Sequence, residues 1–433
     1  MNEVVGAIGL VSLFALLLMR IPIGVALITA SFGGIWGLIG LPAAISTLKA
    51  APYSFAASWQ LSSVPMFLFM GFFCFHAGIT QGLFQAARVW LSRLPGGLAI
   101  ASVFGTAGFA AISGSSVACA AAMGRIAIPE MMKSDYSKAL ASGTVAAAGT
   151  IGALIPPSII FIIYGIMAEQ PIGDLFLGGA AVGVLTAIGY MAVILIWTLA
   201  KPSAAPRVSE KFTLRERLGT MRLVIPAAVL ALAVFGGLFS GFFTPTEAGA
   251  VGSAIAILIA LSQRSFTWAG FRQSLIESFM TSAGLFVIAI GAKMLTRFVA
   301  LSGVDDAVAL FVINVASDPM VLLLVIALVY LALGMFLDPV GAMLLTLPIL
   351  IPIAEHAAFN MVWFGVLVVK MLEIGMITPP VGLNVFIIKS VVGTSIPLAT
   401  IFRGVGLFLL ADLAVILIVV VFPAVVMFLP NAF

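Results

Sequence analysis

Two short stretches of this 433-residue chain decide its fold: residues 151–157 read IGALIPP, and residues 374–380 read IGMITPP. They lie 223 positions apart (374 − 151), and the same offset pairs the Ile-Pro at 128–129 with the Ile-Pro at 351–352. A register that holds over so long a segment indicates an internal repeat rather than a chance match of apolar sequence.

Each stretch ends in a Pro-Pro pair, which a continuous α-helix cannot accommodate. The second Pro has no N–H to donate, and the residue before a Pro is pushed to extended dihedral angles. We therefore expect the helices predicted over 139–167 and 361–388 to be interrupted in mid-membrane. The segments 113–117 (SGSSV) and 336–340 (FLDPV) are predicted to be the non-helical tips of two hairpins.

The composition predicts a polytopic helical membrane protein. Hydrophobic residues make up 63% of the chain and charged residues only 8%, too few to cover a soluble surface. Apolar runs such as 223–241 and 405–429 have the length that spans a bilayer core. Cys74 and Cys119 are isolated, with neither CxxC spacing nor clustered His, so we predict neither a disulfide framework nor a cysteine metal site.

Basic residues next to membrane helices stay on the cytoplasmic side and so predict orientation. Arg20 follows the first helix. Arg88 and Arg93 precede the stretch 97–131, and Lys133 and Lys138 follow it. The linker 201–222 carries six basic and two acidic residues, a cytoplasmic signature rather than a nucleic-acid patch. The stretch 97–131 starts and ends on this side, so we predict a re-entrant hairpin.

The second half mirrors the first. No Lys or Arg occurs from 298 to 369, so the hairpin predicted over 320–353 enters from the outside. We expect an all-α fold of two inverted repeats, 1–200 and 223–433, each with about five crossings and one hairpin. The expected parts are scaffold helices (1–60 and 223–272), an amphipathic connector (41–60), hairpins with broken helices (97–167 and 320–388) and a last helix (404–429). Both termini are predicted to be periplasmic.

Backbone left unpaired at membrane depth is tolerated where it lines a cavity or binds something, as in inverted-repeat transporters. Freed carbonyl oxygens and short hydroxyls suit hard cations such as Na⁺. We predict about two Na⁺ sites and no organic cofactor. The predicted Na⁺ ligands are Ser115, Ser116, Gly152, Ile155 and Pro156 at site one, and Gly334, Asp338, Gly375, Thr378 and Pro379 at site two.

An anionic substrate is expected at the half-helix N-termini that follow the breaks, where N–H groups are free. Its predicted contacts are Gly114 and Gly341 at the tips, and Ser158 and Asn384 after the Pro-Pro pairs. Structural alternatives stay open. Ser115, Ser116 and Asp338 are also typical helix caps, and Thr378 can bond back to a carbonyl of its own helix.

The remaining polar residues are given structural roles. Lys370 and Glu373 are spaced i, i+3 and are expected to neutralise each other. Asp412 is expected to pair with a neighbour, while Lys293 and Arg297 fit the topology poorly and are expected to snorkel or pair. Buried acids and His are scarce, which favours Na⁺ over H⁺ as the coupling ion. There is no GxxxxGK[ST] phosphate loop, and no arrangement here indicates an enzyme.

The segments 113–165, 334–354 and 373–387 resemble the hairpins and broken helices of a known family: the large, DctM-type membrane subunit of tripartite ATP-independent periplasmic (TRAP) transporters. The likeness runs along nearly the whole chain. It implies a Na⁺-coupled elevator transporter of the bacterial inner membrane that imports a small organic carboxylate. The implied partners are a separate small four-helix subunit of the DctQ type, a periplasmic substrate-binding protein and membrane lipid.

The resemblance also implies that the Na⁺ positions fall on Ser115, Ser116, Gly152, Ile155, Gly334, Gly375 and Thr378. Two alternatives are kept. One is a stand-alone divalent-anion/Na⁺ symporter of the same superfamily, which would need no binding protein. The other is a passive channel or a membrane scaffold that does not transport.

Overall fold

The computed structural model describes residues 2–206, 212–304 and 318–432. Within these ranges the chain forms helices and short connections, and no strand. Part of the predicted basic linker, residues 207–211 with Arg207 and Lys211, lies outside the described residues.

The helices of the first half, in order, are α1 (Asn2–Leu18), α2 (Ile23–Ile39), α3 (Leu41–Ala56), η1 (Trp59–Ser62), α4 (Ser63–His76), α5 (Ile79–Leu91), α6 (Gly97–Ser113), α7 (Ser116–Lys133), α8 (Lys138–Gly149), η2 (Thr150–Ala153), α9 (Ile159–Met167) and α10 (Ile172–Ala200). The second half contains η3 (Pro202–Ala204), α11 (Leu214–Phe239), α12 (Pro245–Ser262), α13 (Trp268–Ser302), α15 (Pro319–Gly334), α16 (Pro339–His356), α17 (Met361–Gly375), α18 (Leu383–Val392), α19 (Leu398–Val421) and α20 (Ala424–Met427).

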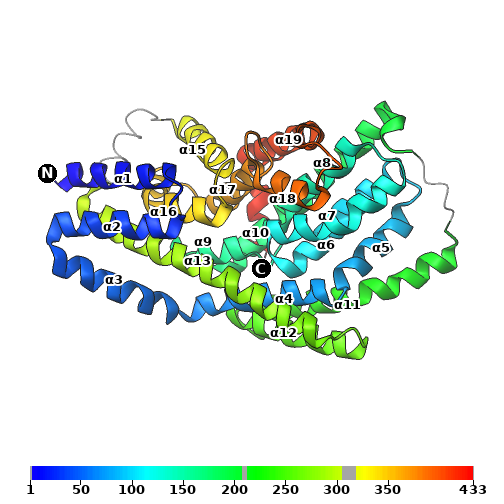
Figure 1. The fold of residues 1–433 in the computed structure, drawn as a ribbon, viewed down its shortest axis with the longest axis horizontal. Coiled ribbons are helices and arrows are strands. Elements are labelled where there is room, and N and C mark those ends of the chain that lie inside the picture. Colours follow the sequence, from blue (N-terminus) through cyan, green and yellow to red (C-terminus); the bar gives the residue numbers. More distant parts are fainter. Residues whose placement is uncertain (1, 207–211, 305–317, 433) are drawn as a thin grey trace.

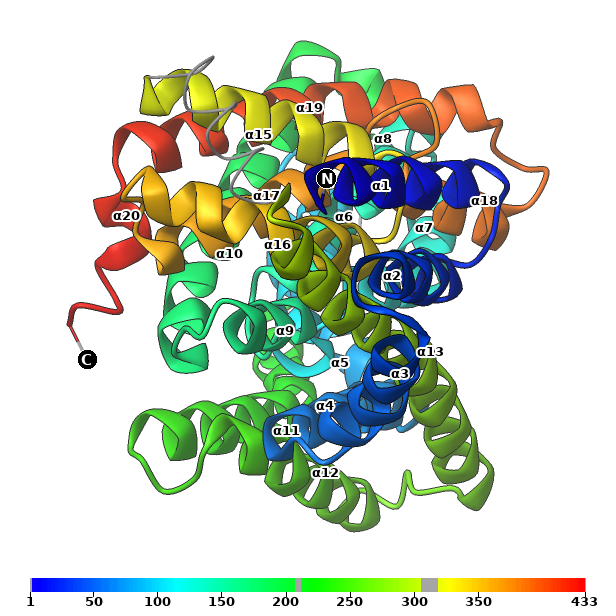
Figure 2. The ribbon, with the colours of Figure 1, turned by 90° about the vertical axis from the view of Figure 1, so that its left-hand side faces the viewer.

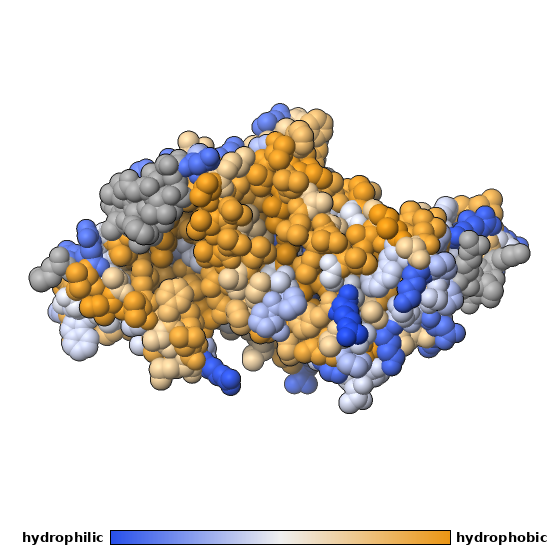
Figure 3. Space-filling view, turned by 90° about the horizontal axis from the view of Figure 1, so that it is seen from above, coloured by the Kyte–Doolittle hydropathy of each residue, from blue (hydrophilic) through white to orange (hydrophobic). Residues whose placement is uncertain are grey.

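Among the described residues, six helices are long and apolar enough to cross a membrane, or seven if the bent pair of α3 and α4 counts as one span. The outer surface is also that of a protein that crosses a membrane. Figure 3 shows a broad hydrophobic area, with hydrophilic residues gathered mainly toward one end. Large apolar side chains are exposed, among them Leu410, Leu413 and Leu417 on α19. Contiguous apolar surface of this extent is typical of contact with lipid or another membrane protein.

The predicted helix interruptions are confirmed. The helix α8 ends at Gly149 and continues only as a 3₁₀ turn to Ala153, and α9 begins at Ile159. Likewise α17 ends at Gly375, and α18 begins at Leu383. Both Pro-Pro peptide bonds, at 156–157 and 379–380, are cis.

Both predicted hairpins are helix–turn–helix pairs, and their re-entry into the membrane stays a prediction. Between α6 and α7 the chain turns at Gly114, whose φ of 62° lies in the left-handed region that glycine adopts without strain. Between α15 and α16 it turns over residues 335–338, and Pro339 opens α16. The opposite orientation of the two halves stays a prediction.

Two groups of helices lie at opposite sides of the molecule. Figure 2 shows α4, α11 and α12 at one side and α15, α17 and α19 at the opposite side. The long helix α13 packs against α2 and α4 and also against α16 of the second hairpin. The two halves interlock, because α8 packs against α19 and α7 against α18.

Three helices complete this part of the fold. The predicted connector 41–60 is largely helical, as α3, and its helix is bent by 55° against the one that follows. Arg88 lies in α5, a short helix whose apolar side packs against α6 and α11. The helix α13 runs for 35 residues, since neither Pro nor a capping turn interrupts it.

Candidate functional site

A cavity of about 300 Å³ lies where the two hairpin tips meet the scaffold. Its polar lining comes from both halves of the chain: Gly114, Ser115, Ser116, Thr281, Asp338 and Glu373. Leu68 and Phe72 of α4 and Leu285 of α13 add apolar walls. Segments that are far apart in sequence therefore converge on one pocket.

At the predicted site one, the first tip packs directly against the first break. A Cβ on Gly114 would lie 2.1 Å from the carbonyl oxygen of Pro157, and a Cβ on Gly152 would lie 2.8 Å from that of Ser115. Only glycine permits such close approach of two backbones. The carbonyl of Gly114 accepts a hydrogen bond from the N–H of Ile159 at 3.3 Å.

Unpaired carbonyl oxygens remain at this break. Those of Ile155 and Pro156 accept no hydrogen bond from the described residues. Buried carbonyls without donors cost free energy unless a cation or water fills the gap. Because carbonyl oxygens are hard ligands, the arrangement fits a small alkali cation.

The serines of site one also serve as helix caps. The hydroxyl of Ser115 accepts from the N–H of Ala118 at 3.4 Å at the start of α7. That of Ser158 accepts from Phe161 and donates to the carbonyl of Ala153 at 2.6 Å. Ser115 still lines the cavity, whereas Ser158 is fully buried and is not among its lining residues.

Site two shows the same close packing between its tip and its break. A Cβ on Gly375 would lie 2.6 Å from the Cα of Gly334, and Gly382 donates its N–H to the carbonyl of Met335 at 3.1 Å. The carbonyl oxygens of Thr378 and Pro379 accept no hydrogen bond from the described residues. Both breaks therefore carry carbonyl oxygens without a donor among the described residues, but Pro156 is buried at the first break whereas Pro379 is exposed at the second.

The side chains of site two take the structural positions that the sequence left open. Asp338 caps α16, with its Oδ1 accepting from the N–H of Gly341 at 2.9 Å. Thr378 donates to the carbonyl of Ile374 at 2.7 Å. Neither bond uses all the lone pairs of the oxygen, so both oxygens retain capacity for a cation.

Asn384 does not line the cavity. Its side chain is fully buried, its amide N lies 3.1 Å from where a Cβ on Gly149 would be, and neither amide atom has a hydrogen-bond partner among the described residues. The predicted substrate contact is therefore directed toward α8, beside the first break.

The expected pair of Lys370 with Glu373 is wrong. Lys370 donates to Asp412 Oδ1 at 2.6 Å and to Thr186 at 3.1 Å, and all three side chains are buried. Tyr190 also donates to Asp412, at 2.8 Å. Neighbouring helices decide the pairing, because α19 brings the Asp412 carboxylate to Lys370 and α10 adds the Thr186 hydroxyl. The expectation that Asp412 pairs with a neighbour is confirmed.

Glu373 is the site residue that sequence reasoning missed. It lines the cavity and accepts a hydrogen bond from the Ser116 hydroxyl at 2.9 Å. A signal was available: an acid two residues before a helix break at membrane depth is costly unless it has a function. In the sequence analysis Glu373 was instead paired with Lys370, because the i, i+3 spacing on one helix was the only criterion used.

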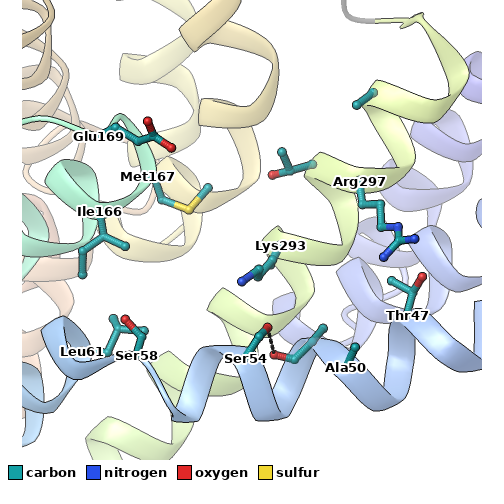
Figure 4. A pocket seen from close by; sticks show the side chains of 13 residues that line it. Thr47, Ala50, Ser54, Ser58, Leu61, Ile166, Met167, Glu169, Lys293 and Arg297 are labelled. Carbon is teal, nitrogen blue, oxygen red and sulfur yellow. Dashed lines mark hydrogen bonds between the residues drawn. The ribbon is translucent and has the colours of Figure 1, made fainter.

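A second cavity, of about 510 Å³, lies between α3, α13 and the end of α9. Figure 4 shows the side chains of Lys293 and Arg297 on α13, with Glu169 on the opposite wall. Neither basic side chain has an ion-pair partner within the described ranges. The expected pairing of Lys293 and Arg297 is thus not found among the described residues. With Glu169 as the one acid in the lining, the two basic side chains give this cavity an excess of positive charge.

Comparison with known proteins adds the family. The family model described as "Tripartite ATP-independent periplasmic transporter, DctM component" matches residues 10–425. The chain is 35% identical over 405 residues to the C4-dicarboxylate TRAP transporter large permease protein DctM of Pseudomonas aeruginosa, covering 92% of each chain. It is 32% identical over 377 residues to the sialic acid TRAP transporter large permease protein SiaM of Vibrio cholerae, covering 87% of each.

Among solved structures, the YdaH transporter of Alcanivorax borkumensis superposes with a TM-score of 0.63. The match covers 89% of this chain and 90% of that one at 15% identity. At that identity the likeness concerns the fold alone, which is that of a helical membrane transporter.

Proposed function

This chain belongs to the DctM component family of tripartite ATP-independent periplasmic transporters, and from that premise we propose that it imports a small organic carboxylate together with Na⁺. Membership makes it the large permease subunit of a transporter and not an enzyme. It also implies a small membrane subunit, a periplasmic binding protein and a multi-pass location in the inner membrane.

The observation that carries the proposal is the pair of helix breaks with unpaired carbonyl oxygens, each packed against a hairpin tip. Residues of both tips line one cavity. Na⁺ would bind to the oxygens of Ser115, Ile155 and Pro156 at site one, and of Thr378, Pro379 and Asp338 at site two. The remaining predicted ligands, Ser116, Gly152, Gly334 and Gly375, hold the tips against the breaks. Bound cations would also offset the negative charge of an entering carboxylate.

The carboxylate would bind in the cavity between the tips. The N-terminus of α7 lies at its wall, and N–H groups at a helix start attract anions. The names of two relatives indicate C4-dicarboxylates and sialic acids as first substrates to test. We further propose that hairpins and broken helices move as one body along α4 and α13, in the manner of an elevator.

Reconstitution tests this function. The chain, its small subunit and its binding protein are placed in liposomes, and uptake of labelled succinate and N-acetylneuraminate is measured with and without a Na⁺ gradient. We expect uptake of one of them, only with both Na⁺ and binding protein present. Uptake without the binding protein would favour the stand-alone symporter, and flux that follows the substrate gradient alone would favour a channel.

A further inference from the structure

Lys293 and Arg297 are two cations on one membrane helix that form no ion pair with a described residue. They lie four positions apart on α13, both are exposed, and both line the second cavity. Figure 4 shows Lys293 extending from α13 into the space between this helix and the end of α9. Like charges one helical turn apart repel each other, and charged residues within membrane helices typically mark the path of a substrate or ion. The pair therefore favours an anion in this cavity.

The second cavity and the cavity between the hairpin tips are bounded by the same segments of the chain. The helix α13 contributes Thr281 and Leu285 to the cavity between the tips, and Thr296 with the two cations to the second cavity. Opposite α13, the first is lined by α4 and the second by α3 and η1. Leu285 and Thr296 are eleven positions apart (296 − 285). They share one face of α13 and are separated along it by about 16 Å, because eleven residues make about three helical turns.

The two cavities differ in charge. None of the described residues that line the cavity between the tips is Lys or Arg, whereas two acids, Asp338 and Glu373, lie in its wall. Beside Lys293 and Arg297 a carboxylate would gain Coulomb attraction from two cations at short range. The Arg297 guanidinium can also bind both carboxylate oxygens at once. The part of α13 that lines the second cavity is therefore the better place for an anion.

The proposed elevator movement would bring the hairpin tips to these cations. The hairpins are proposed to slide along α4 and α13, and a shift of about 16 Å toward the end of α13 would place them beside Thr296. Residues 298–369, which follow Arg297, contain no Lys or Arg, so this end of α13 is predicted to be outside. The cations therefore lie on the side from which the substrate arrives.

We propose that Lys293 and Arg297 bind the carboxylate of the substrate in an outward state, in which the hairpin tips lie beside these two side chains. The inference rests on the proposed function and deepens it, because it assigns the counter-charges of the substrate. When the tips return to the position seen here, the substrate leaves both cations and faces the apolar side chains of Leu68, Phe72 and Leu285 instead. Its affinity falls with this step, which favours release on the inner side.

Cysteine cross-linking in the reconstituted three-component transporter tests the position of the tips. Val117, at the start of α7, lines the same cavity as Thr281, whereas Thr296 lines the second cavity. Val117→Cys/Thr281→Cys should form an inner cross-link in the state described here, and Val117→Cys/Thr296→Cys an outer cross-link only after the tips have moved. Single-cysteine variants are the controls, because the chain also contains Cys74 and Cys119.

The substrate dependence of the outer cross-link tests the two cations. With Na⁺ present, addition of succinate or N-acetylneuraminate on the loaded binding protein should raise the outer cross-link severalfold, because a ligand shifts the population toward the state that it binds better. Lys293→Gln/Arg297→Gln should abolish this rise and leave the cross-link without substrate unchanged. Arg297→Lys, which keeps the charge and loses the planar fork, should retain part of the rise. The matched control Arg264→Gln/Arg272→Gln should respond as the wild type does.

Two outcomes would overturn the inference: an inner cross-link without any outer one, or a rise with substrate that is unchanged in Lys293→Gln/Arg297→Gln. The proposed function fails in a different way. If uptake proves independent of Na⁺ while the substrate still raises the outer cross-link only in the presence of both cations, the Na⁺ coupling is rejected and the inference stands.

Discussion

The hydroxyl of Ser116 donates a hydrogen bond to Glu373 over 2.9 Å, although 257 positions separate the two residues in the chain. One is the first residue of α7, at the first hairpin tip, and the other lies in the last turn before the second helix break. The two halves therefore share one polar contact at the wall of the cavity between the hairpin tips.

The close packing of the second tip on the second break predicts the effect of a single methyl group. In Gly375→Ala the new Cβ would meet backbone atoms of Gly334 at 2.6–2.7 Å, so we expect a loss of about 1–3 kcal/mol in the free energy of unfolding. Gly284→Ala is the control, because a Cβ there meets nothing within 4 Å and alanine favours a helix by about 0.5–1 kcal/mol. Chemical denaturation in detergent measures both; equal stability of the two variants would contradict the packing.

The buried pair of Lys370 and Asp412 predicts non-additive stability. Lys370→Met leaves the Asp412 carboxylate buried without its cation and should cost about 3–5 kcal/mol in unfolding free energy. The double variant Lys370→Met/Asp412→Leu removes both charges and should recover most of this loss. A double-mutant cycle measured by denaturation checks it, and additive losses would show that the pair is not coupled.

The proposed Na⁺ role of Thr378 is separable from its hydrogen bond within the helix. Thr378→Val keeps the shape and removes the hydroxyl, so the Na⁺ concentration for half-maximal uptake should rise severalfold. Thr106→Val is the matched control, because Thr106 makes the same kind of bond to Ser102 O at 2.7 Å and is not a predicted ligand. If both variants raise the Na⁺ requirement equally, Thr378 is not a ligand.

The positive charge of the second cavity predicts a role in attracting the substrate. In Lys293→Gln/Arg297→Gln the cavity shown in Figure 4 loses both cations, so KM for the carboxylate should rise while the maximal rate stays near that of the wild type. The effect should shrink at high salt, which screens exposed charges. The matched control is Arg264→Gln/Arg272→Gln, on another part of the surface. A KM that is insensitive to salt would argue against electrostatic attraction.

Tyr136, in the connection between α7 and α8, predicts a loss of stability at alkaline pH. Burial raises the pKa of its phenol above the ordinary value, although the backbone N–H of Leu98 donates to it at 3.3 Å. Because the folded protein disfavours the phenolate, the contribution of Tyr136 is present below about pH 10 and is lost as the pH rises further. The thermal midpoint should fall less steeply above about pH 10 in Tyr136→Phe than in the wild type. If the thermal midpoints of the two proteins fall equally with pH, Tyr136 is not the cause of the alkaline loss of stability.

Part of this architecture is a property of the sequence alone. The Pro-Pro pairs at 156–157 and 379–380 break a helix wherever they occur, because proline lacks an N–H and restricts the residue before it. Gly114 and Asp338-Pro339 likewise set the hairpin turns through local backbone preferences. The membrane class follows from composition. The helix breaks and hairpin turns could be predicted without knowing which segments pack against them.

Other features depended on which helices meet. Sequence spacing paired Lys370 with Glu373, but α10 and α19 bring Thr186 and Asp412 to Lys370 and leave Glu373 facing the cavity. Asn384 was expected at the substrate and instead lies against α8. Local rules act over a few residues through covalent geometry, whereas the partner of a buried charge is chosen by packing between segments that are distant in the chain. The tertiary structure therefore decided which polar side chains reach the cavity.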